Sequence, residues 1–169
     1  NKSAHPDFKE WFYRRYEPNL KYYTHTQKNW KYERIKKFNL FKKKVPQNHL
    51  IEITNMHLAA LSLLNDKGAF EKELELWDLY LITMTKKGAF PLEAQRGAHA
   101  IGYTAKSIMG LMKMAHIAEI QGFNLWDRKY EKEYQNLHYA IEFLINTLAN
   151  NKLIWIYAKT NDSAGKTKY

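Results

Sequence analysis

Apolar residues recur at intervals of three and four along most of this chain, which is the spacing of one face of an α-helix. Alternation of apolar and polar positions, the pattern of a half-buried strand, is almost absent. The first strongly periodic segment follows Pro46 and predicts a helix over residues 47–65, with Gly68 marking the break after it. The pattern therefore indicates an all-α fold.

A second helix is predicted over residues 70–85. It is followed by Lys86-Lys87-Gly88, and two cations before a glycine are typical of a helix C-terminus. Four apolar positions fall on one stripe of this helix and are expected to face the core: Leu74, Trp77, Leu81 and Met84.

Two more helices complete the periodic part of the chain. The third begins at Pro91 and extends over residues 91–120, although Gly97, Gly102 and Gly110 weaken it. The fourth is predicted over residues 127–149. Its expected inward positions are Tyr134, Leu137, Ile141, Leu144, Ile145 and Leu148.

Short connections between these helices favour antiparallel neighbours, so the sequence predicts a bundle or a curved stack of antiparallel helical hairpins. We divide the chain into a basic, aromatic-rich N-terminal helical segment (1–46), a helical core (47–158) and a C-terminal tail (159–169) that is expected to be flexible.

Charge and composition narrow the function. The chain has 169 residues and a net charge of +10, of which residues 1–45 supply +9. Such a basic segment favours a polyanion: nucleic acid, anionic lipid or acidic polysaccharide. The absence of cysteine excludes disulfides, thiolate metal sites and cysteine nucleophiles. No apolar run reaches the length of a membrane span.

Polar residues interrupt the third helix on one face. Arg96, His99 and Tyr103 are spaced by three and four residues, and Glu93 lies one turn earlier. The pattern fits either a surface salt bridge between Glu93 and Arg96 beside a half-buried tyrosine, or a site that combines a cation, an imidazole and a phenol.

The start of the first helix is the second polar cluster. Gln47, Asn48 and His49 directly follow Pro46, and they fit either a helix cap or a binding site. His49 and His57 could share a helix face, but no carboxylate joins them at metal-ligand spacing. The sequence thus predicts no metal and no cofactor.

These two clusters together resemble the alginate lyase family, the polymannuronate-cleaving lyases with an all-helical toroid fold. The resemblance rests on QNH at residues 47–49, GAFPLEAQR at residues 88–96 and Tyr103, and it covers about residues 47–126. It implies that the hairpins form an (α/α) toroid or part of one. Leu50-Ile51 stands where the family usually has an aromatic pair, and the family's catalytic domain is longer than this chain.

The resemblance also implies an enzyme, a polysaccharide lyase that cleaves an anionic uronate polymer by β-elimination. The catalytic residues would be Asn48, His49, Arg96 and Tyr103. Asn48, together with Arg96 or His49, would face the substrate carboxylate, and Tyr103 or His49 would move the protons. A periplasmic or secreted location follows from the same resemblance.

Further cations and rings could bind neighbouring sugars. We expect substrate contacts from Arg14, Arg15, Tyr22, Tyr23, Trp30, Glu93 and His99. The partner would be an anionic polysaccharide, and nucleic acid is the less favoured polyanion. The alternative is a non-catalytic helical module that binds acidic polysaccharide or nucleic acid.

Overall fold

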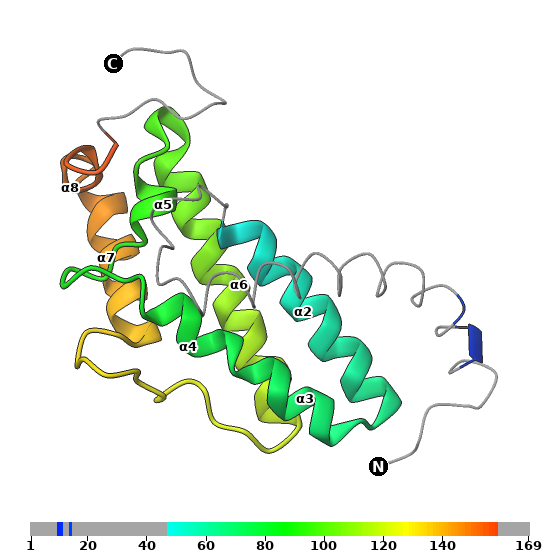
Figure 1. Cartoon of the computed structure of the whole chain (residues 1–169). Coiled ribbons are helices and arrows are strands. Elements are labelled where there is room, and N and C mark those ends of the chain that lie inside the picture. The colour runs from blue at the N-terminus through cyan, green and yellow to red at the C-terminus, as the bar shows by residue number, and fades with distance from the viewer. Residues whose placement is uncertain (1–9, 12–13, 15–46, 159–169) are drawn as a thin grey trace, which may run out of the picture.

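The computed structural model describes residues 10–11, 14 and 47–158. Within these residues every regular element is a helix, so the all-α prediction is confirmed (Figure 1). The elements of the continuous part are α2 (Gln47–Leu64), α3 (Lys67–Leu74), α4 (Leu76–Leu81), α5 (Pro91–Ala94), the 3₁₀ turn η1 (Gly97–His99), α6 (Ala100–Ile120), α7 (Leu137–Ala149) and α8 (Lys152–Trp155).

Helix α2 begins and ends close to where the sequence places it. Asn65 follows it with a positive φ of 58°, a left-handed conformation that asparagine tolerates better than most residues and that stops a helix. Asp66 then caps α3, because its side chain accepts a hydrogen bond from the amide of Ala69.

The helix predicted over residues 70–85 is divided and shorter. It breaks at Glu75, whose amide bonds to the carbonyl of Lys72 three residues back, and α4 ends at Leu81. Thr83 helps to terminate α4, because its hydroxyl donates a hydrogen bond to the Tyr80 carbonyl at 2.8 Å. Gly88 is thus not a helix cap but part of a later turn. The inward stripe is nevertheless confirmed, since all four of its apolar residues are buried.

The long third helix is interrupted as well. Residues 91–120 form α5, the single turn η1 and then α6, with the break centred on residues 95–99. Gly97 has a φ of 55°, in the left-handed region that an α-helix cannot include. Arg96 and His99 therefore lie before α6 rather than on one continuous helix with Tyr103.

The fourth helix begins ten residues later than predicted, at Leu137. Residues 127–136 are irregular because polar side chains satisfy the backbone locally: the Gln135 side chain accepts from the amide of Lys132, and Asn136 caps α7 through the amide of Tyr139. The expected inward face is partly wrong. Leu137 is fully buried, whereas Ile145 and Leu148 are 59% and 66% exposed.

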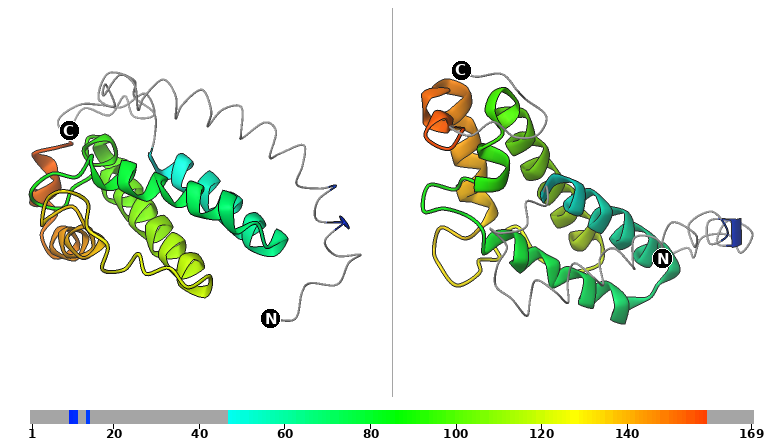
Figure 2. Two further views of the ribbon diagram at one scale, coloured as in Figure 1. Left: turned by 60° about the horizontal axis from the view of Figure 1, so that its bottom comes forward. Right: turned by 45° about the horizontal axis from the view of Figure 1, so that its top comes forward.

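Helices α2 and α6 lie side by side at the centre of the molecule and run in the same direction (Figures 1 and 2). Asn55 of α2 donates to the carbonyl of Gly110, and Gln121 donates to Ser62 further along both helices. A Cβ on Gly110 would collide with the Ile51 side chain, so glycine permits this close approach.

The remaining helices run back along this central pair. His57 of α2 pairs with Glu73 of α3, and Thr54, earlier in α2, bonds to Tyr80, later in the chain, which makes the two segments antiparallel. Helix α7 likewise returns along α6 (Figure 1). The structure thus contains the predicted antiparallel hairpins, and no helix in its described part has the length and apolar character to cross a membrane.

Candidate active site

The start of α2 is held by a carboxylate from another segment. The backbone amide of Asn48 donates to Oε1 of Glu93, in α5, at 3.1 Å. The first amides of a helix have no partner within the helix, so this bond fixes the helix start against α5. Asn48 is 3% exposed, and its Oδ1 atom is buried without a hydrogen-bond partner, whereas His49 is exposed beside it.

Glu93 lies at the centre of this arrangement. Pro91 occupies the first turn of α5, where its missing amide does no harm, and Glu93 follows in the same turn. Its side chain has no exposed surface, and Oε2 lies 3.5 Å from a guanidinium nitrogen of Arg96. We expected Glu93 to contact a substrate; its side chain is fully buried, and that contact stays a prediction.

Arg96 stacks on the ring of Tyr103. The guanidinium carbon lies 3.7 Å from the ring centroid, well within cation–π distance. Because η1 separates Arg96 from α6, the arginine reaches the tyrosine by folding over it rather than by lying two turns away on the same helix. The side chain of Arg96 is only 13% exposed, so both its charge and its plane are held in place.

Tyr103 has two further neighbours. The His99 ring meets it edge-on with 6.0 Å between centroids, and the ammonium of Lys106 lies 5.6 Å from its centroid. The three residues that the spacing grouped, Arg96, His99 and Tyr103, are therefore together, although their local conformation differs from the prediction. Lys106 was not among the predicted site residues, although it lies three residues after Tyr103 on the same helical face.

The N-terminal expectations are mostly beyond what the structure describes. Arg14 is exposed and pairs with Glu10 at 2.6 Å, one turn earlier. Arg15, Tyr22, Tyr23 and Trp30 lie outside the described residues, so their predicted contacts with substrate remain predictions. Among the described residues no group of three or more histidine, aspartate or glutamate side chains could hold a metal ion.

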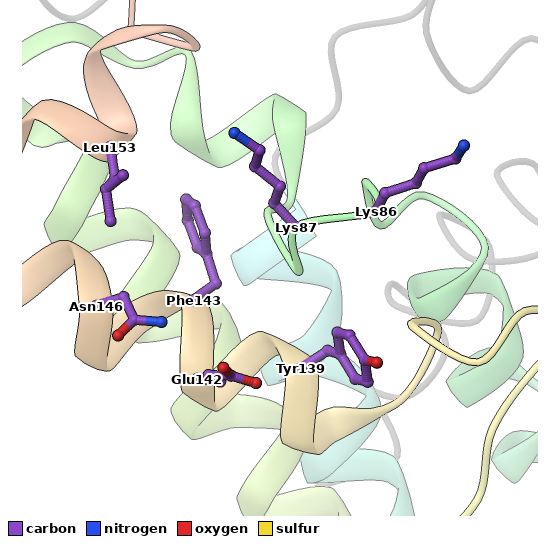
Figure 3. A pocket seen from close by; sticks show the side chains of 7 residues that line it. All are labelled: Lys86, Lys87, Tyr139, Glu142, Phe143, Asn146 and Leu153. Atoms are coloured by element: carbon purple, nitrogen blue, oxygen red, sulfur yellow. The ribbon is translucent and has the colours of Figure 1, made fainter.

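Away from these residues, a hollow of about 320 Å³ lies between the turn at residues 85–89 and α7 (Figure 3). Gly88 shapes the turn: its φ is 84°, and a Cβ there would collide with the carbonyl of Tyr139. Lys86 and Lys87 extend in different directions from this turn, so their charges do not converge on one point (Figure 3). The hollow therefore lacks the focused charge found around Tyr103.

Comparison with known proteins gives the chain its family. The sequence profile of a family described as alginate lyase matches residues 3–155, further in both directions than the expected 47–126. No curated protein sequence matches the chain. Similar solved structures include alginate lyase A1-III as a histidine-to-alanine variant, both in its apo form and complexed with a tetrasaccharide, and as a tyrosine-to-phenylalanine variant complexed with a tetrasaccharide.

Each of these structures has a TM-score of 0.61 and 21% sequence identity, a level at which the likeness shows the fold alone. The matches cover 69–71% of this chain but only 33–34% of the other, so the chain spans about a third of the length of these lyases. The described helices thus have the fold of part of an alginate lyase, an (α/α) toroid. Since the family profile covers most of its length, the chain belongs to the alginate lyase family.

Proposed function

We propose that this protein is a polysaccharide lyase that cleaves an anionic uronate polymer, alginate or a related polyuronate, by β-elimination. The observation that supports this most is the contact series from Asn48 through Glu93 and Arg96 to Tyr103, in a chain of the alginate lyase family. Its partner is an anionic polysaccharide, and its location is periplasmic or secreted.

The reaction requires charge stabilisation and two proton transfers. A base removes the proton on C5 of a uronate unit, the C4–O bond breaks, and a double bond forms between C4 and C5. The C5 proton is weakly acidic because the neighbouring carboxylate already carries a negative charge. Donors aimed at that carboxylate therefore stabilise the dianionic, enolate-like intermediate.

Arg96 and Asn48 are the proposed donors. Arg96 is a fixed cation beside Tyr103, and a guanidinium can bind both oxygens of a planar carboxylate. Asn48 lies at the start of α2 with its backbone amide on Glu93, and we assign its side-chain amide to the substrate carboxylate.

Tyr103 and His49 are the proposed proton carriers. In mannuronate and glucuronate the C5 hydrogen and the C4 oxygen lie on the same side, so one tyrosine can act as base and then as acid. In guluronate they lie on opposite sides, and the exposed His49 would be the base while Tyr103 protonates the leaving oxygen.

The test is to incubate the folded chain with mannuronan, guluronan and glucuronan and to follow the ultraviolet absorbance of the C4–C5 double bond. We expect absorbance to rise, and Tyr103→Phe to lower the rate by at least about a hundredfold, because it removes the proton carrier. Tyr139→Phe, the same change at an exposed tyrosine of α7, is the control and is expected to keep full activity.

A flat trace with all three polymers would count against the lyase proposal. In that case, binding of the same polymers would support the alternative, a non-catalytic module for acidic polysaccharide, and tighter binding of an oligonucleotide would support a nucleic-acid module instead.

A further inference from the structure

A groove of about 370 Å³ lies between α2 and α6. Its floor is fixed by the hydrogen bond from Asn55 to the carbonyl of Gly110 at 2.8 Å, which ties the two helices together. The side chains that the argument below uses are Glu52 and Met56 from α2, and Lys106, Met109 and Lys113 from α6.

The groove is continuous with the candidate active site. Lys106 lines the groove, and its ammonium also lies 5.6 Å from the Tyr103 ring centroid. Lys113 follows two turns later on α6, about 10 Å further along the helix axis. Both lysines are exposed, so they present two cations in a line that starts at Tyr103.

The other side chains give the groove a mixed character. Met56 and Met109 are 44% and 56% exposed, and both line the groove, so they give it apolar surface. Glu52 contributes a carboxylate opposite the lysines. A ligand that suits this groove has carboxylates at intervals, apolar faces between them and hydroxyl groups that can donate to Glu52.

We infer that the α2–α6 groove binds the sugar units next to the cleaved bond of a uronate oligosaccharide, with Lys106 and Lys113 each pairing with a substrate carboxylate. This inference rests on the proposed function. The methionines contact the apolar C–H faces of the sugar rings, and Glu52 accepts hydrogen bonds from sugar hydroxyls. The spacing of the lysines matches carboxylates on separate units of one chain rather than a single small anion.

The groove predicts that affinity depends on chain length. We would measure the Kd of oligomannuronates from two to six units by titration calorimetry, using Tyr103→Phe as the background to prevent turnover. Affinity is expected to rise with length, and the double change Lys106→Gln and Lys113→Gln to weaken the longest oligomer about fivefold, as expected for two exposed ion pairs. The shortest oligomer loses less.

Two matched variants test the specificity of that loss. Lys132→Gln with Lys152→Gln removes the same charge from exposed positions outside the groove, and is expected to leave the length dependence unchanged. Glu52→Gln removes the negative charge that repels an anionic ligand but keeps an oxygen that can accept from a sugar hydroxyl, so it is expected to tighten binding of the longer oligomers. Circular dichroism confirms that each variant is folded.

Equal losses in the two double variants would show that only net charge matters and would overturn the inference. An affinity independent of length, or an oligonucleotide of equal charge that binds the same lysines more tightly, would also overturn it. The absorbance assay is separate: without elimination but with length-dependent binding through Lys106 and Lys113, the lyase proposal fails while the groove assignment stands.

Discussion

At the scale of single residues, Glu93 connects the two polar clusters of this protein. It accepts from the amide of Asn48 and pairs with Arg96, while Arg96 covers Tyr103. A fully buried carboxylate needs such partners, because desolvating an unpaired charge is very unfavourable. Glu93 is therefore a positioning residue in our proposal, acting through Arg96 and the start of α2.

Changing Glu93 separates its two contacts. Glu93→Gln keeps an oxygen for the Asn48 amide but loses the charge beside Arg96, whereas Glu93→Ala loses both. We expect kcat to fall roughly ten- to hundredfold in the glutamine variant with a smaller change in KM, because a misplaced Arg96 matters most as charge develops. The alanine variant is expected to lose about 1–3 kcal/mol more in free energy of unfolding, since the Asn48 amide is left unpaired.

Glu71→Gln is the matched control, because Glu71 is an exposed residue of α3. It is expected to change neither kcat nor stability. Wild-type kcat in Glu93→Gln would show that the charge of Glu93 does not position Arg96.

At the scale of elements, one turn depends on glycine. The turn at residues 85–89 packs against α7 through Gly88, whose φ is 84° and whose Cα faces the carbonyl of Tyr139. Gly88→Ala is expected to lower the free energy of unfolding by roughly 1–3 kcal/mol, because it adds both a steric clash and left-handed strain. Chemical denaturation measures this loss.

Gly102 offers the contrasting case within α6. A Cβ there meets nothing within 4 Å, so Gly102→Ala is expected to stabilise the protein by up to about 1 kcal/mol through helix propensity. Equal destabilisation by the two alanine changes would mean that the turn does not pack on α7 as described.

The contact between α2 and α4 gives a pH dependence. Thr54 donates its hydroxyl proton to the Leu50 carbonyl, so the hydroxyl of Tyr80 donates to Thr54 at 2.9 Å. Burial of Tyr80 raises its pKa above the ordinary value, and the nearby Glu73 carboxylate adds to this shift. In the unfolded chain the same tyrosine ionises near its ordinary pKa.

The pKa of Tyr80 is higher in the folded than in the unfolded protein, so protonated Tyr80 stabilises the fold. This stabilisation is complete below about pH 10 and is lost as the pH rises towards the folded pKa. The free energy of unfolding, measured with urea, is thus expected to fall steadily above about pH 10. In Tyr80→Phe it is expected to fall less steeply with pH, and to be about 1 kcal/mol lower than in the wild type at neutral pH. Parallel pH curves for the two proteins would contradict this.

At the scale of the whole molecule, one face of α7 and α8 is apolar and exposed. Its large side chains are Ile145, Leu148, Trp155 and Ile156. Phe143 lies on the opposite face of α7 and is buried, and Leu137, in the first turn of the helix, is buried as well. Because burial decides how strongly a side chain stabilises a fold, the two faces of this helix are expected to respond very differently to substitution.

Ile145→Ser and Leu148→Ser are each expected to change the free energy of unfolding by no more than about 0.5 kcal/mol. Leu137→Ala and Phe143→Ala are expected to lower it by about 2–5 kcal/mol each, through lost contacts and a cavity. Urea denaturation measures all four. Large losses from the serine variants would mean that another part of the protein covers this face in solution.

The sequence alone determined the helical class, the start of α2, the buried stripe of α3 and α4, and the grouping of Arg96 with Tyr103. These features depend on neighbours within a few turns, and apolar spacing records such neighbours directly. The short segments around Asn48, Arg96 and Tyr103 also sufficed for the family, which the profile match then established.

Only the tertiary structure decided where helices break and what joins the polar clusters. Asn48 and Glu93 are 45 residues apart in the chain, and no local pattern pairs them. The break at residues 95–99 contains Gly97 in a left-handed conformation, and α7 starts late because Gln135 and Asn136 satisfy the backbone before Leu137. The break at Glu75 has no glycine or proline beside it, so apolar spacing did not predict it. The exposure of Ile145 likewise follows from which helices surround α7, and periodicity gives the apolar face of a helix but not the partner that covers it.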